Sequence, residues 1–150
     1  MHDRAWEKMM DPDAPLPFSL KDWVDLAPFE RTLGIKIRSA SNGQAILTMP
    51  FTVKLAQGMG LMHGGAITSL ADTAAAIAIK TLLAPDTHFA TVRLQMRFLA
   101  PVTRGIITAR AEADPAKGRE RTFLGRVQIV DEEGKTVARF SSEFRVARNQ

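Results

Sequence analysis

The chain has 150 residues, of which 45% are hydrophobic and 24% are charged, and its basic residues exceed its acidic residues by a formal charge of +4. This length fits one domain and the composition is that of ordinary globular proteins, which excludes a disordered tail, a fibre and a membrane protein. The chain contains no cysteine, which excludes disulfides, thiol nucleophiles and thiolate metal sites and is typical of a reducing cytoplasm.

The first 33 residues differ from the rest of the chain. They carry four basic and seven acidic side chains, together with four prolines. We expect residues 1–33 to form short helical pieces that wrap the main domain, with Trp23, Phe29 and Leu33 as anchors. No segment supplies the roughly 18 consecutive apolar residues of a membrane helix, and the N-terminus lacks the apolar block of a secretory signal. We therefore expect a cytoplasmic protein whose globular domain spans residues 34–150.

Strand-like alternation begins directly after this segment. Ile35 and Ile37 alternate with charged residues, and Ser41-Asn42-Gly43 is typical of a hairpin turn between this strand and a second one over residues 44–49. Further strands are expected over residues 92–98, 106–113, 122–130 and 136–146, with turns at 115–118 and 132–134.

One long helix is expected between the second and third strands, over residues 64–83, with Pro85 closing it. Its circumference is mostly apolar and rich in alanine, which predicts a buried helix that a sheet approaches closely. The pattern therefore predicts an α+β protein of the hotdog type, in which a curved antiparallel sheet of five to six strands wraps a long central helix.

Asp72 is the only acidic residue between Glu30 and Asp86, and it lies in the middle of this helix. A carboxylate half-buried in such a helix is costly unless it is hydrogen-bonded or used in chemistry. A helix face that merely reaches solvent is the alternative. Helical spacing places several polar residues on the same arc, namely Thr68, Ser69, Thr73 and Lys80.

Two glycines begin the predicted helix. Backbone N–H groups at a helix start lack intrahelical partners and lie at the positive end of the helix dipole. At Gly64 and Gly65 no Cβ hinders the approach of a ligand oxygen, and one such donor stabilises an oxyanion by roughly 3–4 kcal/mol. A plain glycine-capped helix start is the alternative. A dinucleotide-binding motif is excluded, because its third glycine position holds His63.

The spacing Gln57-x-x-Gly60-x-x-His63-Gly64-Gly65, with Asp72 nine residues after His63, resembles the active-site signature of the hotdog acyl-CoA thioesterases. The similarity is to the phenylacetate-degradation (PaaI-type) branch of the 4-hydroxybenzoyl-CoA thioesterase superfamily. It continues through the expected strand that ends in Phe98-Leu99-Ala100-Pro101 and covers about residues 34–146.

The resemblance implies a role for each matching residue. Asp72 acts as general base on a water or as nucleophile on the thioester carbonyl, and Gly64 donates its backbone N–H to the carbonyl oxygen, with Gly65 beside it against the substrate. Thr91 orients the water and the carboxylate. His63 shapes the loop and hydrogen-bonds near the thioester, or it is a structural histidine satisfied by backbone.

Gln57 stands where the PaaI-type pattern has Asn. A Gln occurs at this place in the 4-hydroxybenzoyl-CoA branch, whose acid is Glu, and its amide can still donate to the carbonyl oxygen. This mixture leaves both water attack and a covalent anhydride open. A thioester carbonyl is already electrophilic, so the chemistry requires no metal and no cofactor beyond the coenzyme A of the substrate.

The stretch from Arg93 to Arg126 holds eight basic residues against three acidic ones. Coenzyme A is a polyanion, and we predict phosphate contacts from Lys117 and Arg119 in the turn around Gly118; a solvated surface is the alternative. We expect no nucleic-acid partner, because the chain lacks tyrosine and both tryptophans lie in residues 1–33, which leaves no stacking platform among the arginines.

Met59 and Met62 are predicted to line an adaptable acyl pocket, with core filling as the alternative.

The resemblance implies a homodimer whose sheets join edge to edge, often paired into a homotetramer, with Asp72 of one chain facing Gly64 and Gln57 of another. The predicted function is hydrolysis of an acyl- or aryl-CoA thioester. A non-catalytic acyl-CoA sensor and a hotdog dehydratase or hydratase are the alternatives.

Overall fold

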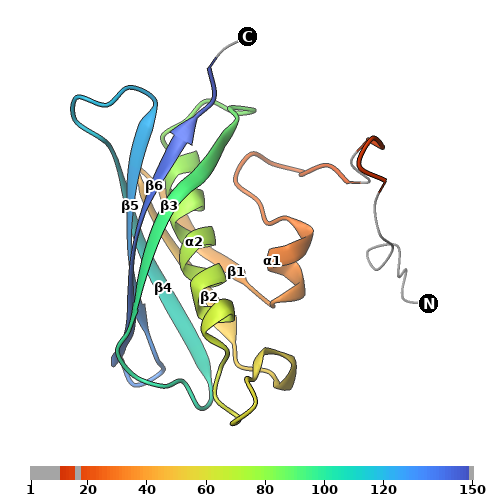
Figure 1. Ribbon diagram of the computed structural model, residues 1–150, viewed down its shortest axis with the longest axis vertical. Coiled ribbons are helices and arrows are strands. Elements are labelled where there is room, and N and C mark those ends of the chain that lie inside the picture. The colour runs from red at the N-terminus through yellow and green to blue at the C-terminus, as the bar shows by residue number, and fades with distance from the viewer. Residues whose placement is uncertain (1–10, 16–17, 149–150) are drawn as a thin grey trace.

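A six-stranded antiparallel sheet curves around one long helix in the computed structural model, which describes residues 11–15 and 18–148. The sheet order is β1-β2-β4-β5-β6-β3, and Figure 1 shows α2 inside the curve of this sheet. The predicted α+β hotdog arrangement is confirmed. Of the two tryptophans in residues 1–33, Trp6 lies outside the described residues. The elements are α1 (Pro28–Thr32), β1 (Lys36–Ser41), β2 (Gln44–Pro50), η2 (Val53–Leu55), α2 (Gly64–Lys80), β3 (Phe89–Phe98), β4 (Ile106–Pro115), β5 (Thr122–Val130) and β6 (Thr136–Val146).

The hairpin between β1 and β2 forms at the predicted turn. Asn42 and Gly43 both have positive φ angles, 51° and 77°, as a two-residue hairpin turn requires. A side chain at Gly43 would place its Cβ 2.8 Å from the carbonyl oxygen of Ala113 in β4. Glycine is therefore needed here both for its φ angle and for close packing.

The core lies between α2 and the inner face of the sheet. Four alanines of α2 are fully buried, and Ala75 packs so closely on β5 that a Cβ at Gly125 would lie 2.9 Å from its own Cβ. Burying a large apolar side chain contributes about 1.5–3 kcal/mol, so this core is the main stabilising element. The largest fully buried side chains are Phe144, Leu47, Met49, Leu70, Ile79, Ile107, Ile129 and Val137.

Helix α2 ends at Lys80, three residues before the predicted end at residue 83. The cause is Thr81, whose hydroxyl donates to the carbonyl oxygen of Ala78 (2.6 Å) and accepts the N–H of Gly43 (2.7 Å). A threonine hydroxyl that bonds local backbone competes with continuation of the helix. None of the helices in the described ranges is long and apolar enough to cross a membrane.

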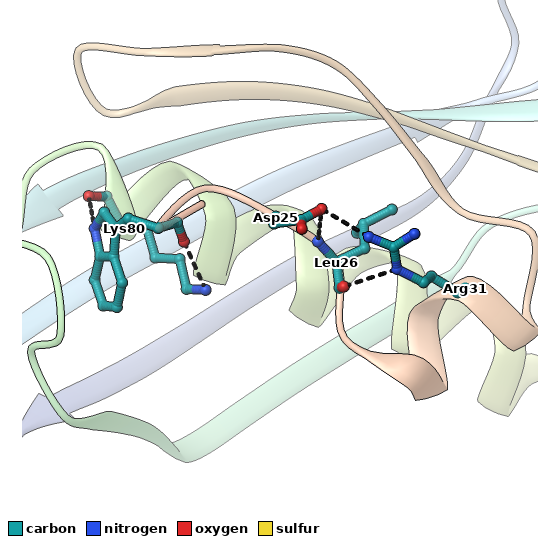
Figure 2. Close-up of polar contacts among 5 residues, drawn as sticks. Asp25, Leu26, Arg31 and Lys80 are labelled. Atoms are coloured by element: carbon teal, nitrogen blue, oxygen red, sulfur yellow. Dashed lines mark hydrogen bonds and ion pairs between the residues drawn. The ribbon is translucent and has the colours of Figure 1, made fainter. Parts of the chain in front are cut away.

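The part of the chain from residue 23 through α1 lies along the side of α2 that faces away from β4 and β5 (Figure 1). The indole N–H of Trp23 donates to the carbonyl oxygen of Lys80 (2.9 Å), and Lys80 Nζ returns a hydrogen bond to the carbonyl oxygen of Trp23 (3.0 Å). Farther along, the guanidinium of Arg31 binds Asp25 and the carbonyl oxygen of Leu26 (Figure 2). The two bonds between Trp23 and Lys80 fasten the segment to α2, whereas those of Arg31 hold residues 25–31 together.

Two of the three predicted anchors of this segment lie against the domain. Trp23 meets Phe89 edge to face, with ring centroids 6.4 Å apart, and Leu33 packs against the core. The prediction for Phe29 is wrong, since this side chain is 61% exposed. Helix α1 has only five residues, and the face that it turns toward the core does not include Phe29.

Strand β3 forms as predicted, but most of its apolar side chains are not in the core. Val92, Leu94 and Phe98 are 51%, 45% and 54% exposed. The reason is topological: β3 is the last strand of the sheet and pairs only with β6, so one of its edges has no neighbour among the described residues. A long, apolar, unpaired edge is the feature that proteins cover with a partner.

Candidate functional site

Asp72 and Thr91 form the polar centre of the site, in the middle of α2 and near the start of β3. The hydroxyl of Thr91 donates to Asp72 Oδ1 at 2.9 Å. No other donor of the described residues bonds this carboxylate, so its second oxygen is open. Burial raises the pKa of Asp72, and the hydrogen bond from Thr91 partly opposes that rise. Thr91 therefore orients the Asp72 carboxylate through one of its oxygens, and burial makes this carboxylate more basic.

The surface of α2 around Asp72 is half-buried and otherwise free of charge until Lys80. The hydroxyls of Thr68 and Ser69 each donate to the backbone four residues earlier, both at 2.8 Å. Thr73 departs from the predicted polar arc, because its side chain is buried. Asp72 is thus the one carboxylate on this face of α2, and its second oxygen is free to accept a proton.

A second polar group lies at the start of α2, where a tight loop precedes the helix. The loop closes through a bridge between Ala56 and Met62, and the N–H of Gln57 donates to Leu61 O at 2.7 Å. Gly60 adopts a φ of +84° in the turn, which glycine accommodates without strain. These bonds hold Gln57 close to the first turn of the helix.

Gln57 is half-buried and keeps one end of its amide free. Its Oε1 accepts the backbone N–H of Met59, so Nε2 remains as a donor for another molecule. Met59 itself is 86% exposed, whereas Met62 is only 4% exposed and belongs to the core. This placement favours the core-filling role for Met62 and leaves Met59 at the surface of the loop.

His63 caps α2 through its side chain. Its Nδ1 accepts the N–H of Gly65 at 2.8 Å, and its carbonyl oxygen accepts the N–H groups of Ala66 and Ile67. A neutral imidazole that accepts at Nδ1 carries its proton on Nε2, which leaves an N–H donor on the exposed side of the ring. The Gly65 N–H, by contrast, is already used and is not available to a substrate.

Gly64 retains the one N–H of this turn that is not engaged. No acceptor in the described part of the chain bonds it, as expected for the first residue of a helix. The ring of Phe98 lies against Gly64 at the position of a side chain, since a Cβ added to Gly64 would lie 3.1 Å from the ring atom Cζ. The sequence assigned Phe98 only to a strand; its place against the helix start became visible in the tertiary structure.

The two polar groups of one chain are too far apart to act on one bond. Asp72 lies eight positions after Gly64, which corresponds to about 12 Å along the helix axis. A reacting carbonyl must lie within hydrogen-bond distance of its N–H donor and about as close to the attacking water. One chain therefore supplies both halves of a site without bringing them together.

The predicted phosphate-binding turn lies at the opposite end of the sheet from Gln57, beside the start of β3. Lys117 is exposed there. Arg119 is engaged within the chain, because its guanidinium makes two hydrogen bonds to the carboxylate of Glu143, at 3.0 and 3.1 Å. A phosphate contact from Arg119 requires exchange of that partner, whereas Lys117 is free of such a requirement.

Comparison with known protein families gives a match over the centre of the chain. A sequence model described as the thioesterase superfamily matches residues 59–138. This stretch includes the start of α2, Asp72, Thr91 and the strands up to the beginning of β6.

Curated relatives and solved structures agree with that match. Acyl-coenzyme A thioesterase PaaI of Escherichia coli is 36% identical over 111 residues, covering 73% of this chain and 76% of the relative. The 1,4-dihydroxy-2-naphthoyl-CoA hydrolase of Listeria monocytogenes is 32% identical over 106 residues, covering 71% of this chain and 85% of the relative. The solved structure of E. coli PaaI has a TM-score of 0.73 at 29% identity and covers 83% and 87% of the two chains.

Proposed function

The chain belongs to the thioesterase superfamily and is a hydrolase of thioester bonds, and from that premise we propose that it hydrolyses an acyl- or aryl-CoA thioester to a free acid and coenzyme A. The observation that carries the residue assignment is the pair of half-sites: a half-buried, singly bonded carboxylate at Asp72 and a free N–H at Gly64.

In the proposed reaction, Asp72 takes a proton from a water molecule that attacks the thioester carbon. The negative charge that develops on the carbonyl oxygen is stabilised by the Gly64 N–H, with the side-chain Nε2–H of Gln57 and the Nε2–H of His63 as further donors. The carbon–sulfur bond then breaks, and the coenzyme A thiolate receives the proton from Asp72. Direct attack by Asp72, through an anhydride that water then hydrolyses, uses the same residues.

Thr91 is assigned a positioning role. Its hydroxyl holds Asp72 Oδ1, which directs the free oxygen outward to the water. A positioned carboxylate base contributes about 10²–10⁴ in rate, and its efficiency is greatest when its pKa approaches the operating pH. The raised pKa of Asp72 moves it in that direction. No metal or cofactor is needed for this chemistry.

We further propose that the working unit is a homodimer in which Asp72 of one chain acts with Gly64 and Gln57 of the other. The separation of about 12 Å along α2 argues against a site within one chain. The unpaired edge of β3, with its exposed Val92 and Leu94, offers the surface for pairing. We also propose that two dimers associate into a tetramer. A cytoplasmic location is proposed as well, because it suits a chain without cysteine.

The test is release of the coenzyme A thiol from a panel of aryl- and aliphatic acyl-CoA thioesters, by wild type and by Asp72→Asn. Asparagine keeps the shape and can still accept from Thr91, but it cannot take a proton. We expect a loss of about 10² or more in kcat with KM largely retained. Gln57→Ala should lower kcat less, because the Gly64 donor remains.

Each other outcome has a definite meaning. Unchanged turnover by Asp72→Asn removes Asp72 from the mechanism. Binding of acyl-CoA without thiol release from any substrate identifies a sensor, and hydration of an unsaturated acyl-CoA without thiol release identifies a hydratase.

A further inference from the structure

The outer face of the sheet, which points away from α2, carries a line of aligned arginines. Arg110 in β4 lies opposite Gln128 in β5, Gln128 lies opposite Arg139 in β6, and Arg139 lies opposite Arg97 in β3. Their neighbours along each strand, such as Ala109 and Phe140, are buried against the helix side. We call Arg97, Arg110 and Arg139 the arginine row.

Within the part of the chain that the structure describes, no carboxylate balances the charges of the arginine row. The carboxylates on the same face already have partners: Arg126 binds Asp114 at 2.8 Å and Glu112 at 3.7 Å, and Glu143 binds Arg119. No acidic side chain of the described residues pairs with a member of the row.

The alignment itself carries a cost for the folded chain. Arg97 and Arg139 are directly opposite each other on adjacent strands, where like charges destabilise a sheet. Nothing in the packing of the core requires arginine at these exposed positions. The row is therefore a feature that the fold does not explain.

The arginine row borders a hollow of about 640 Å³ on this face. Ala45 and Ala111 border its floor, with their side chains turned into the core, while long side chains such as Gln95 and Arg126 rise around it. The volume falls within the range of small-molecule sites, roughly 300–1,000 Å³. Guanidinium groups present pairs of N–H donors that match the oxygens of a phosphate group.

We propose that this hollow binds a small polyanion that carries phosphate groups, at a site separate from the thioester site. The sheet lies between the hollow and Asp72, so the same bound molecule cannot occupy both. A second copy of this face is a poor occupant, because it would set one arginine row against another. A polyphosphate supplies the missing negative charge and relieves the repulsion between Arg97 and Arg139.

The test is calorimetric titration of the full chain with pyrophosphate, 3′,5′-ADP and coenzyme A. We expect saturable binding of all three that weakens with added salt, and a loss of about tenfold or more in pyrophosphate affinity in Arg139→Gln and in Arg97→Gln. The matched control is Arg104→Gln, which removes the same charge from an exposed loop residue outside the hollow and should bind as wild type does. Circular dichroism checks that each variant is folded.

The relative affinities for the three ligands show which phosphate compound the hollow binds. Equal affinity for pyrophosphate and coenzyme A indicates a free polyphosphate, and tighter binding of 3′,5′-ADP and coenzyme A indicates the nucleotide portion of the coenzyme. In the absence of ligand, Arg139→Gln should unfold at a higher temperature than wild type, because one of two facing charges is gone.

Three results would overturn the proposal: no saturable binding of any of these anions, equal weakening by Arg104→Gln, or binding only of single- or double-stranded nucleic acid. Each of these is independent of thioester hydrolysis, which the Arg variants are expected to retain.

Discussion

At the scale of single residues, Asp72, the proposed base, departs from what folding alone favours. Most of α2 is alanine, isoleucine and leucine packed at zero or near-zero exposure, yet one carboxylate interrupts it. Burial disfavours the charged form and raises the pKa of Asp72, so its ionised form is costly to the folded state. The hydrogen bond from Thr91 offsets part of this cost and explains why the group is tolerated.

This balance predicts how the pH profile responds to Thr91. The base must be ionised, so kcat/KM falls as the pH drops below the pKa of Asp72. Because the Thr91 hydroxyl lowers that pKa, Thr91→Val should shift the acidic limb to higher pH, while Thr91→Ser should leave it near wild type. The measurement is kcat/KM against pH.

Thr108→Val is the matched control for this shift, since it deletes a half-buried hydroxyl on the outer face of β4. An unmoved limb in Thr91→Val, or a shift to lower pH, would show that the bond to Thr91 does not act on the catalytic ionisation.

At the scale of elements, the first turn of α2 combines capping with a free donor. His63 satisfies the N–H of Gly65 and leaves that of Gly64 unengaged. The φ and ψ of His63, −61° and 132°, are extended values that also allow a proline to follow. Proline is well tolerated at the first position of a helix, so the donor can be deleted without breaking the helix.

Gly64→Pro and Gly64→Ala therefore form a matched pair. Both add a Cβ that meets Phe98 at about the same place, 3.1 Å from Cζ, but only proline removes the N–H. We expect kcat of Gly64→Pro to lie about 10²–10³ below that of Gly64→Ala, with similar melting temperatures. Equal rates in the two variants would mean that the Gly64 N–H does not bind the carbonyl oxygen.

Also at the scale of elements, the periodicity of apolar residues predicts a strand but not its place in the sheet. The alternation over residues 92–98 correctly predicts a strand, but alternation cannot tell a core face from a face that awaits a partner. Only the sheet order places β3 at the edge. In the same way, the end of α2 at Lys80 depends on a hydrogen bond that Thr81 accepts from Gly43 in a distant hairpin, which no local pattern reveals.

At the scale of the whole molecule, the proposed site takes Asp72 from one chain and Gly64 from the other, and this arrangement gives a decisive experiment. A mixed dimer of an Asp72→Asn chain with a Gly64→Pro chain has one site with both changes and one site with neither, if the residues act across the interface. Co-expression with random pairing should then restore about one quarter of wild-type activity, since half of the dimers are mixed and each has one intact site of two.

If the two residues instead acted within one chain, every site of the mixed dimer would carry one damaged residue. Activity in the mixture no higher than the mean of the two inactive homodimers would therefore exclude the shared site. Copurification through two different affinity tags confirms that the mixed dimer has formed.

The amino-acid sequence by itself determined the elements and the candidate chemistry, because periodicity, turn residues and helix-start glycines act over a few neighbouring positions. It placed the hairpin at Asn42-Gly43, the buried helix from Gly64 and the lone carboxylate within it. The tertiary structure decided which donors are free, which methionine is core, and that Thr91 meets Asp72 across 19 positions of the chain. It also decided the alignment of the arginine row, because arginines on three different strands share one face only after the sheet has set their register.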